Sequence, residues 1–292
     1  MSRFLGTGVA LITPFHSDGS IDFEALSVTI EHLINGKIEY IVVLGTTAES
    51  ATLSKSEKKQ IFHFVSEKVN QRVPLVAGIG GNNTAEIVEE VAQFDVNGYE
   101  AILSVSPYYN KPTQEGIYQH YKAIAQASKL PIILYNVPGR TGMSMTAETT
   151  LRLAREFKNI IATKEASGSF DQFNAIMAGK PEGFELISGD DPVTLPMVAL
   201  GAIGVISVIG NAFPAQFSEM VRLSLKGDYA AARPVHNSFI EIIRLCFVDS
   251  NPCGVKAIMQ ELGLIKDNVR LPLTPVTDAT RDKIKAEVNK LK

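Results

Sequence analysis

The feature that most constrains the fold is an alternation of short apolar runs with longer helical patterns, recurring roughly every 30 residues. The runs are nearly continuous in Val, Ile and Leu, as in parallel strands whose two faces are both covered. Eight such runs are expected as strands: Val9–Ile12, Tyr40–Leu44, Pro74–Ile79, Ala101–Val105, Pro131–Tyr135, Ile160–Lys164, Phe184–Ser188 and Gly204–Val208.

Helix start signals lie between these runs. Ser54 and Glu57 have the spacing of a capping box, and Asn83 and Glu86 resemble one with Asn as the cap. Other helices are expected at Asp22–Asn35, Thr113–Ser128, Thr146–Phe157, Asp171–Ala178, Val193–Leu200 and Pro214–Leu225.

Eight such strand–helix units predict an α/β fold, a (β/α)8 TIM barrel, over residues 1–226. An open doubly wound sheet is the alternative, but it would usually offer a Gly-rich loop after the first strand, and Thr13-Pro14-Phe15 is not one. After Gly227 only helical patterns remain, at Asp228–Val248, Pro252–Leu262 and Asp278–Lys290. We therefore expect a C-terminal helical domain over residues 227–292, packed on the barrel.

Composition narrows the possible partners and location. The chain of 292 residues is 45% hydrophobic and 20% charged, which fits a soluble globular protein, and its net charge of −3 gives no reason to expect nucleic acid. No apolar run reaches the ~20 residues that span a membrane, and the N-terminal residues do not resemble a signal peptide. With two cysteines and five scattered histidines, we expect a cytoplasmic protein with reduced thiols and no metal.

The sixth expected strand ends on Lys164, an unusual residue for the end of a buried strand. A lysine amine attacks a carbonyl only when it is neutral, and desolvation lowers its pKa, as in lysines that form Schiff bases. Lys164 is therefore a candidate nucleophile. The alternative is a lysine that extends to solvent or pairs with Glu165.

Barrel enzymes place their sites at the C-terminal ends of the strands, so residues at the other strand ends are further candidates. Thr46 and Thr47 could bind a carboxylate, Tyr135 could transfer protons, and Arg140 could bind a second carboxylate through its planar fork. Each also has a structural explanation: a turn for the threonines, core packing for Tyr135, and an ordinary surface position for Arg140.

Three further residues at the strand ends could likewise have either a role in the site or only a structural role. Tyr108 and Tyr109 could be packing or subunit-contact aromatics, and Gly189 could be only a turn residue. The strand ends carry neither the paired acids of a glycosidase nor a Ser-His-Asp set. Together they suit a lysine nucleophile acting on small carbonyl compounds that carry carboxylates.

At these residues the chain resembles the dihydrodipicolinate synthase family, part of the pyruvate-dependent class I aldolase superfamily that includes N-acetylneuraminate lyase. The similarity covers nearly the whole chain, and its segments are Gly45–Ser50, Ser106–Pro112, Leu134–Gly142, Thr163–Gly168, Gly204–Val208, Asn251-Pro252 and Leu271–Pro275. The resemblance implies a lyase that condenses pyruvate with L-aspartate-4-semialdehyde to give 4-hydroxy-tetrahydrodipicolinate, in lysine and diaminopimelate biosynthesis. It implies no cofactor, and a homotetramer built as a pair of tight dimers.

The resemblance also assigns catalytic roles. Lys164 matches the Schiff-base lysine, and Tyr135 matches the tyrosine that donates a proton near the imine. Thr46 and Tyr109 match its proton-relay partners, and in the family the second of these comes across a subunit interface.

Binding roles follow in the same way. Thr47 and Ile206 match pyruvate contacts, the latter through its backbone, and Gly189 is a further substrate-binding candidate. Arg140 matches the arginine that receives the semialdehyde.

Two departures from the family pattern stand out. Ala48 replaces a frequent glycine, with little expected effect unless that backbone needs a positive φ. Lys55 and Lys58 stand where members inhibited by lysine commonly carry histidines, and added positive charge should weaken a cationic effector. We therefore expect weak or absent lysine inhibition at the matching allosteric positions, which also include Ser50, Ala51, Asn82, Glu86 and Tyr108.

Two alternatives remain open at this point. Another pyruvate-dependent aldolase, such as a sialic-acid or ketodeoxy-sugar lyase, would share the lysine but should want more hydroxyl-binding groups. A non-catalytic barrel that binds a small acid would form no covalent adduct.

Overall fold

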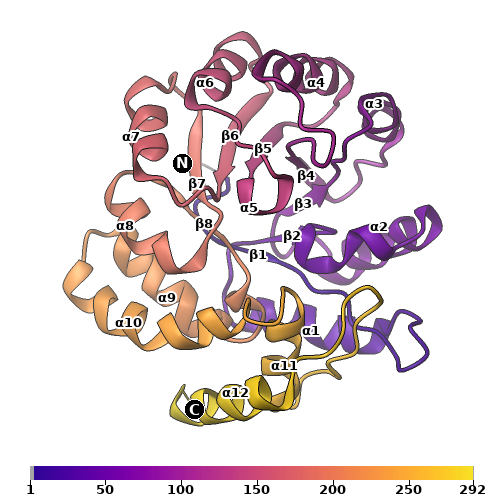
Figure 1. Ribbon diagram of the computed structural model, residues 1–292, viewed down its shortest axis with the longest axis vertical. Coiled ribbons are helices and arrows are strands. Elements are labelled where there is room, and N and C mark those ends of the chain that lie inside the picture. The colour runs from indigo at the N-terminus through magenta and orange to yellow at the C-terminus, as the bar shows by residue number, and fades with distance from the viewer. Residues whose placement is uncertain (1–2, 292) are drawn as a thin grey trace.

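The computed structural model describes residues 3–291, so the first two residues of the expected barrel and the last residue of the expected extension lie outside the described residues. Within this range, parallel strands form a closed barrel in chain order, ringed by helices (Figure 1). The TIM-barrel prediction is confirmed. The strands are β1 Gly6–Ala10, β2 Tyr40–Val43, β3 Leu75–Gly78, β4 Tyr99–Val105, β5 Ile132–Asn136, β6 Ile160–Glu165, β7 Glu185–Ser188 and β8 Gly204–Ser207.

Among the described residues, eight helices, one after each strand, cover the outside of the barrel, and the last but one is short. These helices are α1 Phe23–Asn35, α2 Lys55–Val69, α3 Thr84–Gln93, α4 Gln114–Ala127, α6 Ala147–Glu156, α7 Phe170–Gly179, α8 Thr194–Ala199 and α9 Pro214–Leu225. Short elements follow the strands directly at the mouth: the 3-10 turns η1 Thr46–Ala48, η2 Ser50–Thr52, η3 Asp191–Val193 and η4 Ile209–Asn211, and the one-turn helix α5 Pro138–Thr141.

Helix capping matches the sequence in one case and departs from it in another. Ser54 and Glu57 form the expected capping box, since each side chain accepts the other's backbone N–H at 3.2 and 2.8 Å. Asn83 is the N-cap residue of α3, as expected, but the capping box does not form, because its side chain accepts no helix N–H. Its backbone lies at φ −107° and ψ 101°, away from the φ −67° and ψ 160° at which Ser54 caps.

The first strand begins earlier than expected, at Gly6 rather than Val9, because its pairing with β8 starts with Gly6 opposite Gly204. Gly8 is required within it: a Cβ there would lie 2.2 Å from the Tyr40 ring, which fills the barrel interior. A small residue at this position therefore makes room for a large one on the next strand.

Alternation along the strands decides which side chains enter the barrel. The interior cluster includes Ile133 and Tyr135 of β5, Ala162 of β6 and Ile187 of β7. Because successive strand residues face opposite sides, Lys164 shares the inner face of β6 with Ala162. Tyr135 pairs in register with Lys164, so the two candidates lie side by side on neighbouring strands.

Three helices follow the barrel: α10 Tyr229–Leu245, α11 Cys253–Glu261 and α12 Asp278–Leu291, along the lower edge of Figure 1. They share an apolar core with α9, and the cluster also includes Ile12 and Val205 from the barrel. The helical extension is confirmed, while the division into domains at residues 226 and 227 stays a prediction. Along residues 3–291 no helix is long and apolar enough to cross a membrane, and the cytoplasmic location stays a prediction.

Candidate active site

Lys164 lies at the C-terminal end of β6 with 5% of its surface exposed. Burial lowers its pKa to about 8; the Arg140 charge acts in the same direction, and Asp191 and Asp190 oppose it. At that pKa roughly one amine in ten is neutral at pH 7, far more than for an ordinary lysine. The amine is therefore desolvated enough to react with a carbonyl.

The alternative reading of Lys164 as a partner of Glu165 is wrong. Glu165 lies on the other face of β6, and its carboxylate accepts N–H groups from Asn136 (3.0 Å), Ser167 (2.8 Å) and Gln172 (3.1 Å). Asn136 in turn accepts the Met145 N–H at 2.9 Å. This polar cluster on the outer face ties the ends of β5 and β6 to the loop after α5.

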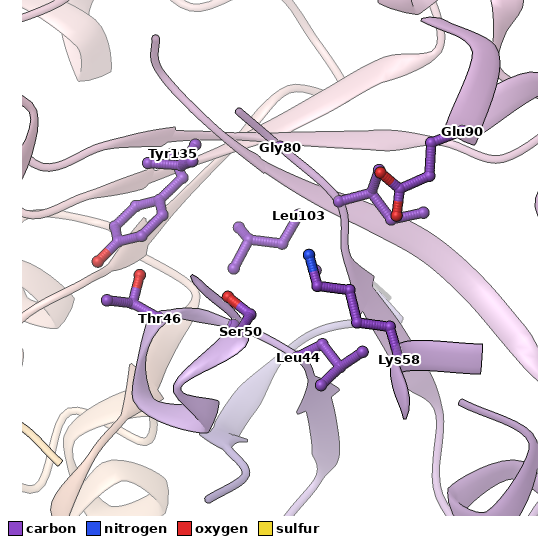
Figure 2. Close-up of a pocket in the computed structure, with 12 residues that line it drawn as sticks. Leu44, Thr46, Ser50, Lys58, Gly80, Glu90, Leu103 and Tyr135 are labelled. Atoms are coloured by element: carbon purple, nitrogen blue, oxygen red, sulfur yellow. The ribbon is translucent and has the colours of Figure 1, made fainter. Parts of the chain in front are cut away.

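Tyr135 lies beside the lysine on the neighbouring strand. The Lys164 amine lies 4.3 Å from the centroid of the Tyr135 ring. Burial raises the pKa of Tyr135 to about 12, while the Arg140 charge and the Thr46 hydroxyl act in the opposite direction. Figure 2 shows the hydroxyl oxygens of Tyr135 and Thr46 pointing toward each other. A neutral phenol held beside the amine and a second hydroxyl can donate and accept protons.

Thr46 and Thr47 begin the turn η1 that follows β2. Thr46 is half-buried and faces Tyr135, whereas Thr47 is 2% exposed and its hydroxyl accepts a 3.1 Å bond from the Asn251 amide. The two threonines thus have different surroundings, and the extension reaches the mouth of the barrel through Asn251.

The remaining binding candidates lie at different places relative to Lys164. Ile206 is buried on β8 inside the barrel. A Cβ on Gly189 would lie 2.7 Å from the Ala166 Cβ and 3.1 Å from the Lys164 Cγ, so glycine leaves room beside the lysine. Arg140 is exposed on α5, close enough for its charge to lower the pKa of Lys164.

Asp191 was not singled out by the sequence analysis. It is 2% exposed, one carboxylate oxygen accepts the N–H groups of Val208 and Ile209 at 3.0 and 2.9 Å, and burial raises its pKa to about 6. Its charge raises the pKa of Lys164. Two consecutive acids after a barrel strand, Asp190 and Asp191, were the available signal.

A hollow of about 450 Å³, open mouth included, extends outward from the two facing hydroxyls (Figure 2). Its lining includes Ser50 and Lys58 from the allosteric candidates, and Glu90, which was not singled out. The Lys58 amine points into it (Figure 2).

The other allosteric candidates lie outside this lining. Asn82 donates to the Tyr108 carbonyl at 3.1 Å. The exposed side chains are Ala51, Lys55, Glu86 and, at 39%, Tyr108.

Tyr109 is not part of the mouth in a single chain. It is 88% exposed and has a left-handed backbone at φ 71°. An exposed tyrosine with this backbone is unusual for a residue that only packs within its own chain.

The described residues contain no group of three or more His, Cys, Asp or Glu side chains that could hold a metal ion. The polar side chains around Lys164 bring a phenol, a guanidinium and the carboxylates of Asp190 and Asp191 close to its amine. A buried amine of lowered pKa inside a barrel, beside a phenol, has the features of enzymes that use a lysine on carbonyl compounds.

A family model described as the Dihydrodipicolinate synthetase family matches residues 3–291. The chain belongs to this family. The resemblance drawn from the strand ends is confirmed.

Two relatives are similar over almost their full length. The 4-hydroxy-tetrahydrodipicolinate synthase of Parabacteroides distasonis is 56% identical over 286 residues, covering 98% of this chain and 96% of that protein. That of Phocaeicola vulgatus is 54% identical over 291 residues, covering 100% and 98%. Both relatives are named as 4-hydroxy-tetrahydrodipicolinate synthases, which favours the synthase reaction over the reaction of a sugar-acid lyase.

A solved structure is also similar. The chloride-inhibited dihydrodipicolinate synthase from Acinetobacter baumannii, complexed with pyruvate, has a TM-score of 0.95 and 40% identity, and the match covers 98% of both chains.

Proposed function

We propose that this chain condenses pyruvate with L-aspartate-4-semialdehyde to give 4-hydroxy-tetrahydrodipicolinate, a step of lysine and diaminopimelate biosynthesis, through a Schiff base on Lys164. The two synthase relatives support the overall reaction. The observation that carries the mechanism is the buried amine of Lys164, whose pKa is lowered to about 8.

The neutral Lys164 amine attacks the ketone of pyruvate, and loss of water gives an imine. Once protonated, the imine withdraws electrons, so a methyl proton leaves and an enamine forms. The enamine carbon attacks the aldehyde, and the substrate amine then closes the ring at the imine carbon and displaces the lysine. Tyr135 donates and accepts the protons of these steps, with Thr46 and Tyr109 relaying them to and from solvent.

Binding is divided between the two substrates. Thr47, Ile206 and Gly189 hold pyruvate beside the lysine, which the A. baumannii complex with pyruvate supports at the level of the family. Arg140 on α5 receives the carboxylate of the semialdehyde, because its planar fork can bind a carboxylate through two hydrogen bonds. Orientation of the aldehyde by a second anchor can supply several kcal/mol toward the barrier.

The test is reduction with borohydride in the presence of pyruvate, followed by mass spectrometry of the intact protein and its peptides. We expect a stable adduct on Lys164, and none in a Lys164→Ala variant that folds normally. An adduct on another lysine, or turnover by the Lys164→Ala protein at the wild-type rate, would overturn the assignment.

The assembly is proposed as a homotetramer made of two tight dimers. The strong exposure of Tyr109 supports a role for that side chain across a subunit contact rather than in its own chain. Tyr108, also exposed, would lie at the same contact.

Lysine inhibition is proposed to be weak or absent. Lys58 points a cationic amine into the hollow and Lys55 lies nearby on α2, so both would repel the amines of a lysine effector (Figure 2). We expect no half-inhibition at sub-millimolar lysine. The double variant Lys55→His/Lys58→His should bind lysine more tightly in calorimetry; equal binding by both proteins would contradict the proposal.

A further inference from the structure

A fully buried ion pair links the mouth of the barrel to the C-terminal extension. Lys256 of α11 and Glu49, which stands between η1 and η2, are both 0% exposed in their side chains, with 2.5 Å between Nζ and Oε1. The two residues are 207 positions apart in the chain. Neither residue of the pair is among the candidate catalytic residues.

Each partner of the pair makes a second hydrogen bond. The second oxygen of Glu49 accepts the Arg270 backbone N–H at 2.9 Å, and the Lys256 amine also donates to the Asn268 carbonyl at 2.9 Å. The amine lies 4.4 Å from the centroid of the Phe15 ring. These contacts therefore hold both side chains of the pair in a single conformation.

The backbone of Glu49 explains why this geometry bears on the site. Its φ of 55° is left-handed, a conformation that residues other than glycine rarely adopt. Its N–H donates to the Thr46 carbonyl at 3.2 Å, and its carbonyl accepts the Thr52 N–H at 2.9 Å. Anchoring the Glu49 side chain thus holds the turn that carries Thr46.

Stability alone is a weak reason for such a pair, since replacing a buried ion pair with apolar residues is often neutral or stabilising. We propose that the Glu49–Lys256 pair positions the hydroxyls of Thr46 and Thr47 against Tyr135 and Lys164, so that the extension takes part in catalysis. This inference rests on the proposed function, because it assumes that the two threonines act there.

A second contact supports the same conclusion from a different residue. The Asn251 amide, just before α11, donates to the Thr47 hydroxyl at 3.1 Å. The segment around α11 thus holds η1 at two points, through its middle residue Thr47 and through Glu49, the residue that follows the turn.

The test removes both charges together, in Glu49→Gln/Lys256→Met, so that no charge is left buried alone. Because a displacement of about 1 Å can cost ~100-fold in rate, we expect kcat to fall by about 10- to 100-fold in a folded protein. When the same replacement is combined with Thr46→Val, kcat should be little lower than in Thr46→Val alone, because the pair acts through the Thr46 hydroxyl.

The control is Glu241→Gln/Arg244→Met, which removes another ion pair of the extension, at 2.6 Å on α10, that does not touch the turn. It should leave kcat unchanged. A folded Glu49→Gln/Lys256→Met protein with wild-type kcat, or a loss that adds in full to that of Thr46→Val, would overturn the inference.

Should the pair replacement fail to fold, Asn251→Ala tests the same idea, with an expected rise of about tenfold in the KM for pyruvate. An unchanged KM overturns it. Borohydride trapping of pyruvate on the wild-type protein separates the two proposals: an adduct on Lys164 with no effect of the variants rejects this inference alone, and no adduct rejects the proposed function as well.

Discussion

At the scale of single residues, the Lys164 amine is held between opposing influences. Burial and the Arg140 charge favour the neutral amine, while Asp190 and Asp191 favour the ammonium, and the result is a pKa of about 8. A strictly apolar pocket would lower the pKa further. The acids keep the group able to take up a proton, as an imine intermediate requires.

The pH dependence of adduct formation follows from this balance. Below its pKa the amine is protonated and cannot attack, so trapping of pyruvate by borohydride should speed up with pH and level off above about 8. Asp191→Asn removes a negative charge that raises this pKa, so the midpoint should move to lower pH. The control Asp249→Asn changes an acid that accepts the Thr277 N–H elsewhere. Equal midpoints in all three proteins would contradict the role of Asp191.

Tyr135→Phe tests proton transfer at the imine. The ring still packs against the Lys164 amine, so the fold should persist, while kcat should fall by about 100- to 1000-fold. Steady-state kinetics measure kcat, and thermal unfolding measures the stability of the fold. The control is Tyr99→Phe, which removes a buried hydroxyl that donates to the Phe62 carbonyl away from the mouth. It should cost stability and leave kcat intact, and a similar loss of kcat in both would refute the assignment.

At the scale of elements, the ends of β5 and β6 are tied together on the outer face of the barrel. Asn136 and Glu165 pair in register directly after Tyr135 and Lys164, and Asn136 also accepts the Met145 N–H. The same residues that fix the strand ends therefore fix the loop directly after α5, the one-turn helix that carries Arg140.

Asn136→Ala should therefore affect one substrate more than the other. It leaves the Glu165 carboxylate and the Met145 N–H short of a partner, which should cost about 2 kcal/mol or more of unfolding free energy. The loosened loop should raise the KM for the semialdehyde by about tenfold, with less change for pyruvate. Asn159→Ala, which removes a bond to the Ala125 carbonyl at the other end of β6, is the control. Equal changes in both KM values would contradict the prediction that this loop affects the binding of the semialdehyde more than that of pyruvate.

Local signals in the sequence accounted for the regular elements and failed at the irregular ones. The strand runs and the capping box at Ser54 were readable because they depend on neighbours in the chain. The 3-10 turns at the mouth were not, because contacts from remote segments hold them: Thr13 donates to the Ala48 carbonyl and Lys256 to Glu49. At Asn83 the sequence indicated the correct start of α3 but not the side-chain bond, which does not form.

At the scale of the whole molecule, the mouth of the barrel is built from parts that lie far apart in the chain. The extension reaches the mouth through Asn251 and Lys256, and Tyr109 is exposed where a second copy could use it. The hypothesis of a tight dimer thus carries a chemical consequence.

Mixing inactive subunits tests that consequence. Lys164→Ala and Tyr109→Ala proteins should each be nearly inactive. If Tyr109 acts across the interface, a mixed dimer contains one intact site, and exchanged subunits should recover up to about a quarter of wild-type activity. Light scattering must show the same assembly for all samples. No recovery after subunit exchange would place Tyr109 in its own site or outside catalysis.

The sequence by itself determined the barrel, the helical extension, the candidate nucleophile and the strand ends around it, because strand and helix periodicities and βα order are local properties of the chain. Only the tertiary structure decided that Lys164 points inward with a lowered pKa, that Glu165 points outward, and that Asp191 and the Glu49–Lys256 pair belong to the same mouth. Desolvation and buried charge pairing depend on which distant residues surround a group, and no local pattern encodes that neighbourhood.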